Sequence, residues 1–115
     1  MKALFIVNDG PYGSERPYNA LRLAGTLTGR AGCEVRVFLI GDAASCAKSG
    51  QKVPEGFYNV QVMLNKVSRS GEVGVCGTCM AARGIADEDL IEGLHKSTMA
   101  ELADWTEWAD QIMVF

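Results

Sequence analysis

The sequence lacks the features that mark several large classes of protein. No apolar run approaches the length of a membrane-spanning helix, and the run Ala3–Val7 ends at the polar pair Asn8 and Asp9. The formal net charge is −3, which gives no sign of a nucleic-acid partner or of an anionic membrane surface. We therefore expect a cytoplasmic protein with no membrane and no nucleic-acid partner, in a compartment that keeps thiols reduced.

Motifs for common cofactors are also missing. Neither a Gly-x-Gly-x-x-Gly loop nor a Walker-type phosphate loop occurs, so no motif supports a dinucleotide or phosphate site. The chain has one histidine, His95, and its single Cys-x-x-Cys pair has no second pair to complete a zinc site. These absences predict that the protein uses no metal and no organic cofactor.

What is present is an alternation of apolar, strand-forming runs with segments of helical periodicity. Strands are predicted at 2–7, 33–40, 72–76, 94–97 and 111–115, and helices at about 17–28, 43–49, 57–67, 77–83 and 98–108. Short connections between alternating strands and helices indicate parallel pairing with helices packed on both faces. The prediction is a single α/β domain over residues 1–115, a three-layer α/β/α sandwich around a mostly parallel open sheet of about five strands.

The last predicted helix carries two tryptophans. Spacing assigns its inward face to Met99, Leu102, Ala103 and Thr106. Trp105 then lies on the flank and Trp108 nearly opposite that face. Large aromatics outside the core stripe favour a contact surface between subunits.

The chain has four cysteines, and the predicted sheet separates them. Cys76 stands where the third strand becomes a helix, and free backbone N–H groups at such a point favour a thiolate. Cys46 follows the second strand and is predicted to face the same crevice, at the carboxyl edge of the sheet. Cys33 begins the second strand at the opposite edge, where packing is its expected role.

Cys76 and Cys79 form the Cys-x-x-Cys pair, and three kinds of chemistry use such a pair. A zinc site could recruit Cys46 and His95, although their spacing gives it little support. A thioredoxin-type dithiol requires a downstream cis-proline loop, and no proline follows Pro54. The third chemistry is group transfer by one nucleophilic thiol, with Cys79 as its neighbour.

Supporting residues are predicted around the same edge. Arg83 follows Cys79 by one helical turn, so its charge could favour a thiolate. Asn8, Asp9 and Tyr12 belong to the loop after the first strand, which should border the crevice.

Five stretches together carry a resemblance to a known family. They are "NDGPYGSERPYNALRLA", "GDAASCA", "GQKVPEGFYNVQVML", "CGTCMAARGI" and "STMAELADWTEWAD". In this order they resemble the DsrE/DsrF-like family, in particular its small YchN-like branch, over nearly the whole chain. The resemblance implies a three-layer α/β/α fold, a homo-trimer or homo-hexamer, and a place in intracellular sulfur relay.

The resemblance also singles out one residue. In better-understood members, a cysteine before a short helix ending in Arg-Gly carries sulfur as a persulfide. Cys76 matches that cysteine, because Arg83 and Gly84 stand at the same offset downstream. Relatives tend to have a small apolar residue where this chain has Cys79, which leaves open whether one cysteine or both act.

The expected function is therefore sulfurtransferase-like: Cys76 accepts sulfane sulfur from one protein and passes it to another. Two alternatives stay open on the sequence. One is an oligomeric binding or scaffold module with incidental cysteines, and the other is a Cys-x-x-Cys thiol–disulfide redox protein.

Overall fold

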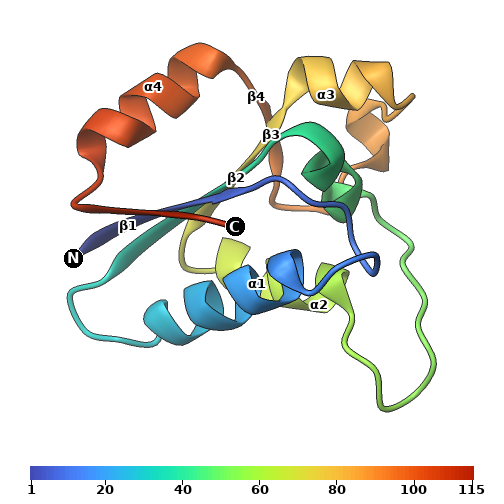
Figure 1. Cartoon of the computed structure of the whole chain (residues 1–115), viewed down its shortest axis with the longest axis horizontal. Coiled ribbons are helices and arrows are strands. Elements are labelled where there is room, and N and C mark those ends of the chain that lie inside the picture. Colours follow the sequence, from blue (N-terminus) through green and yellow to red (C-terminus); the bar gives the residue numbers. More distant parts are fainter.

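The computed structural model describes residues 1–115 and is built on one open, fully parallel sheet (Figure 1). Its strands are β1 (Lys2–Val7), β2 (Glu34–Leu39), β3 (Glu72–Cys76), β4 (His95–Ser97) and β5 (Gln111–Val114). They lie in the order β4-β3-β2-β1-β5, and every neighbouring pair is parallel. The predicted fold class, a parallel α/β sandwich, is confirmed.

One face of the sheet is covered by helices α1 (Arg16–Leu27) and α2 (Val60–Ser68). Alternate strand residues point to this face, so that Phe5, Val37 and Val73 lie side by side across three strands. They belong to an apolar core of 21 buried residues, to which both helices contribute. The predicted start of α2 at Phe57 is wrong: Asn59 caps the helix, and Phe57 lies in the preceding loop with 70% of its surface exposed.

The opposite face is covered by α4 (Met99–Trp108), which Figure 1 shows on the other side of the sheet from α1 and α2. Its core has only five buried residues, namely Leu4, Phe38, Cys76, Leu102 and Trp105.

The predicted phase of this last helix is wrong. Leu102 and Trp105 are buried, whereas Met99 is 64% exposed, and Ala103 and Thr106 face solvent. The tryptophans turn inward because the sheet offers them a cation. The Arg36 guanidinium lies 3.9 Å from the Trp108 ring centre and 5.5 Å from that of Trp105. Trp105 is therefore part of the buried packing of α4, and Trp108 is half-buried against Arg36.

Short helices fill the carboxyl edge of the sheet. These are the 3₁₀ helix η1 (Gly41–Ala47) after β2, helix α3 (Gly77–Ala82) after β3, and the 3₁₀ turn η2 (Asp87–Asp89). Helix α3 packs against η1, which brings two cysteine-bearing segments together. None of the helices is long and apolar enough to cross a membrane.

Candidate functional site

Cys76 is the last residue of β3 and the N-cap of α3. Its Sγ accepts a hydrogen bond from the Cys79 backbone N–H at 3.4 Å and lies 3.4 Å from the Thr78 hydroxyl. Only 9% of the residue is exposed, because Phe38 and the α4 side chains pack beside it. The strand end thus presents one sulfur to the first turn of a helix, as the sequence predicts, but this sulfur is nearly buried.

The Cys79 side chain completes this arrangement. Its Sγ accepts a hydrogen bond from the Gly41 N–H at 3.2 Å, which fixes it between α3 and η1. Burial raises the pKa of Cys79, and its hydrogen bond to Cys76 raises the pKa further. Cys79 therefore keeps its proton and offers it to the neighbouring sulfur.

The pKa of Cys76 is lowered, in contrast to that of Cys79. Burial alone would raise it, but hydrogen bonds from the Cys79 and Thr78 side chains and backbone N–H groups outweigh burial and hold the pKa below its usual range. The pKa shifts of the two thiols are opposite, so Cys76 ionises more readily than Cys79.

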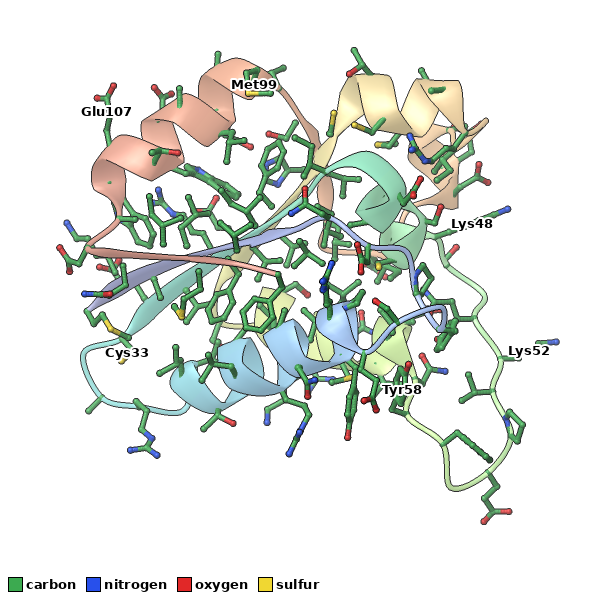
Figure 2. All side chains as sticks on the ribbon, in the orientation of Figure 1. Cys33, Lys48, Lys52, Tyr58, Met99 and Glu107 are labelled. Carbon is green, nitrogen blue, oxygen red and sulfur yellow. The ribbon has the colours of Figure 1, made fainter.

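Cys46 was predicted to face the same crevice as Cys76, but it lies in the large apolar core, whereas Cys76 belongs to the small one. It is fully buried in the large core, where burial raises its pKa to about 12. Its Sγ points to the Asp9 carbonyl oxygen at 3.6 Å, which is a weak hydrogen bond from the thiol. Cys46 therefore remains a neutral thiol. Cys33 is partly exposed and directly precedes β2 at the amino edge of the sheet, where Figure 2 labels it.

Arg83 contacts the site without reaching Cys76. One of its nitrogens forms an ion pair with Asp42 at 2.7 Å, and another donates to the Cys79 carbonyl oxygen at 3.0 Å. Its charge slightly lowers the pKa of Cys79, against the larger effects of burial and of Cys76. Arg83 thus joins α3 to η1.

The loop after β1 lies on the other side of η1. Asp9 borders a second, polar cavity of about 480 Å³ together with Asp42. The Asn8 side chain donates to the Phe115 carbonyl oxygen at 3.1 Å, and the Tyr12 ring stacks on Tyr58 at 5.6 Å. The structure gives none of these three predicted residues a contact with the Cys76 sulfur.

A cavity of about 410 Å³ opens beside Cys76. Its apolar wall consists of Phe38, Ala81 and Met99. Its polar rim consists of Thr78, Lys96, Ser97 and Thr98. The sequence analysis did not predict these residues as part of the site. Ser97 alone could have been found, because β4 pairs with β3 in a register that places Ser97 opposite Cys76.

A polar cluster lies behind this cavity. Both Ser97 and His95 hydrogen-bond to one oxygen of the Glu101 carboxylate, the Ser97 hydroxyl at 2.6 Å. Gly74 makes room for the cluster, because a Cβ there would lie only 3.2 Å from Ser97 Cβ and from the Trp105 ring. His95 is thus bound to a carboxylate. No three His, Cys, Asp or Glu side chains are grouped to hold a metal ion.

The structure is thus that of a small parallel α/β sandwich protein with a cysteine at the end of an inner strand. Comparison with known proteins then assigns the chain to a family. The model of the DsrE/DsrF-like family matches residues 1–115, and the chain belongs to this family.

Individual relatives agree with this assignment. The chain is 40% identical to the protein YchN of Escherichia coli over 116 residues, which span 99% of this chain and 98% of YchN. It is 37% identical to an uncharacterized protein of Methanopyrus kandleri over 110 residues, covering 96% and 90% of the two chains. The crystal structure of E. coli YchN superimposes with a TM-score of 0.94, covering 100% of this chain and 99% of that one. A protein of unknown function from Methanobacterium thermoautotrophicum, 13% identical, shares the fold with a TM-score of 0.73 and 97% coverage of both chains.

Proposed function

We propose that this protein carries sulfane sulfur on Cys76 as a persulfide. The observation that carries the proposal is the pairing of Cys76 with Cys79. One sulfur has a lowered pKa and faces a cavity, and the other has a raised pKa and supplies a hydrogen bond. A nucleophilic thiolate and a proton donor are the two groups that sulfur transfer needs.

The chemistry is a pair of thiol exchanges. The Cys76 thiolate attacks the outer sulfur of a donor persulfide, the donor S–S bond breaks, and the donor leaves as a thiolate that takes up a proton. Cys76 then bears the outer sulfur as Cys76–S–SH. An acceptor thiolate, which we propose is on a partner protein, attacks that outer sulfur and regenerates Cys76. The Cys79 thiol stabilises the Cys76 thiolate before it attacks the donor, and again when that thiolate leaves as the acceptor takes the outer sulfur.

The test is the intact mass of the protein after incubation with a sulfane-sulfur donor. Wild type should gain one sulfur, Cys76→Ser should gain none, and Cys79→Ser should still gain one. Uptake by Cys76→Ser at the wild-type level would show that Cys76 is not the carrier. A redox function would instead give a Cys76–Cys79 disulfide and require both cysteines. A scaffold function would leave Cys76 unreactive near neutral pH.

We also propose that the protein is a homo-oligomer, a trimer or hexamer, as the family resemblance implies. Apolar residues on the α4 side of the sheet support this. Ile112 and Val114 are 43% and 65% exposed on the edge strand β5, and they pair with Leu4 and Ile6 of β1. Exposed apolar side chains on an edge strand favour contact with another protein surface.

Light scattering at micromolar concentration tests the assembly. Wild type should have the mass of a trimer or more, and Val114→Glu should shift it toward the monomer. Val62→Glu, at an equally exposed valine on α2, is the matched control and should leave the mass unchanged. A monomeric wild type would contradict the proposal.

A further inference from the structure

The cavity beside Cys76 restricts what can reach the sulfur. Cys76 is 9% exposed, so a reactant approaches it through the cavity and not across an open surface. The volume of about 410 Å³ lies at the lower end of the range for small-molecule sites. Three apolar side chains, those of Phe38, Ala81 and Met99, form one wall. The space suits a short organic molecule with an apolar middle.

The charge at the rim is positive. Lys96 is the only charged residue that borders the cavity. It pairs with Asp87 at 3.4 Å, but both side chains are more than half exposed, so this ion pair is weak. Exchanging Asp87 for the anionic group of a ligand would therefore cost the Lys96 ammonium group little.

Gly77 determines where the Lys96 side chain lies. A Cβ at residue 77 would stand 3.1 Å from Lys96 Cγ and 3.3 Å from Cδ, closer than a normal contact. The missing side chain lets the lysine stem lie against the residue that follows Cys76. The glycine inside the Cys-Gly-Thr-Cys stretch thus lets the Lys96 stem lie against the residue that follows Cys76, at the border of the cavity.

From this arrangement we propose that the cavity binds a low-molecular-weight organic persulfide that carries a carboxylate, as the direct sulfur donor to Cys76. The carboxylate binds Lys96, the carbon chain lies along Phe38 and Met99, and the outer sulfur meets Cys76 Sγ. The inference rests on the proposed persulfide function and names its donor.

The transfer step balances without any further reactant. Cys76 Sγ forms a bond to the outer sulfur of R–S–SH, and the bond between the two donor sulfurs breaks. The products are Cys76–S–SH and the thiolate R–S⁻, which takes a proton from solvent. No net oxidation occurs, because one persulfide is exchanged for another.

The first experiment compares three donors of similar length. They are the persulfides of 3-mercaptopropionate, 2-mercaptoethanol and cysteamine, whose terminal groups are anionic, neutral and cationic. The rate of sulfur loading, followed by intact mass, should be highest for the anionic donor and lowest for the cationic one. Lys96→Gln should reduce the anionic rate about threefold and leave the neutral rate unchanged, because the lost contact is a solvent-exposed charge pair.

Lys52→Gln is the matched control. Lys52 is exposed on the long loop that Figure 2 shows away from α3, so its removal changes the net charge equally without changing the cavity. Equal loading by all three donors, or equal loss in both lysine variants, would overturn the inference while the persulfide function stands. Faster loading from a folded carrier protein with one surface persulfide would also overturn it, in favour of a protein donor.

A second measurement does not depend on sulfur transfer. Iodoacetate and iodoacetamide differ only in charge, and both alkylate a thiolate. The ratio of their rates at Cys76 should fall about threefold in Lys96→Gln and in wild type at high salt. A fall in this ratio without sulfur loading by any donor would refute the persulfide function, and with it this donor, while showing that the cavity selects anions. An unchanged ratio would refute the proposed role of Lys96.

Discussion

The two faces of the sheet are covered very differently. On the side of α1 and α2, 21 buried residues form a continuous apolar core. On the side of α4, the buried cluster has five residues, and beside it lie a cavity and a hydrogen-bonded carboxylate, Glu101. The first face supplies most of the apolar burial, and the second has a cavity and polar groups beside a cysteine.

The pKa values of two cysteines show the effect of this difference between the faces. Cys46 and Cys76 both follow parallel strands at the carboxyl edge, but Cys46 enters the large core and Cys76 the small one. Burial dominates at Cys46 and raises its pKa to about 12. At Cys76 burial is outweighed by hydrogen bonds, and the pKa is lowered. The thiol with the lowered pKa is the one whose surroundings provide hydrogen-bond donors, and its place at a strand end is not enough by itself.

The largest expected effect is in thiol reactivity. At pH 7.5 the ionised fraction of a thiol with a pKa near 12 is more than about 1,000 times smaller than that of an ordinary cysteine. Iodoacetamide should therefore modify Cys76 in the native protein and leave Cys46 unmodified, as peptide mapping by mass spectrometry can show. Guanidinium should make the two react alike. Comparable labelling of both in the native state would contradict the distinction.

The second prediction compares the two cores by stability. Leu64 on α2 is fully buried in the large core, and Leu102 on α4 is 8% exposed in the small one. Leu64→Ala should cost about 3–4 kcal/mol of the free energy of unfolding. Leu102→Ala should cost about 2 kcal/mol, because a small cluster next to solvent relaxes more easily around a lost side chain. Urea denaturation measures both.

A cost at Leu102 equal to that at Leu64 would contradict this comparison. It would mean that the α4 face contributes to folding as much as the other face does. The five-residue cluster that includes Cys76 would then be packed as tightly as the large core.

The same contrast between the two faces explains which parts of the structure could be predicted from the sequence. The large core was predictable because Phe5, Val37 and Val73 lie in short apolar runs that alternate with helices. The position of Cys76 followed from the same pattern, since β3 ends at the cysteine. These features depend on local periodicity alone.

The packing on the α4 face was harder to predict, because it depends on contacts with side chains of strands far away in the sequence. Met99 looked internal by its apolar character, yet it is exposed beside the cavity. Trp108 looked external by its phase, yet it lies under Arg36 of β2. Lys96 borders the cavity because β4 pairs with β3 at a register that no local pattern reveals.

The smallest expected effect is a pH-dependent change in stability at Glu101. This residue lies on α4, whose packing was predicted poorly from the sequence. Burial would raise the pKa of Glu101, but hydrogen bonds from Ser97 and His95 outweigh it and hold the pKa below its usual range. A carboxylate with a lowered folded-state pKa stabilises the fold at pH values above its unfolded pKa, about 4.3. That contribution is lost as the pH falls through the folded pKa. Because the side chain is 35% exposed, solvent screening limits it to less than about 1 kcal/mol.

Glu101→Gln keeps the size of the side chain and an oxygen that can accept from Ser97, but removes the charge. Its stability relative to wild type should be lower at pH 7 and should approach the wild-type value near pH 3, as urea denaturation across this range can measure. Glu107→Gln is the control, because Glu107 lies on the same helix and points to solvent in Figure 2. This control should shift stability little at either pH. A pH-independent loss in Glu101→Gln would show that the residue acts by shape alone, so that the α4 face, like the α1 and α2 face, would owe its stability to packing and not to charge.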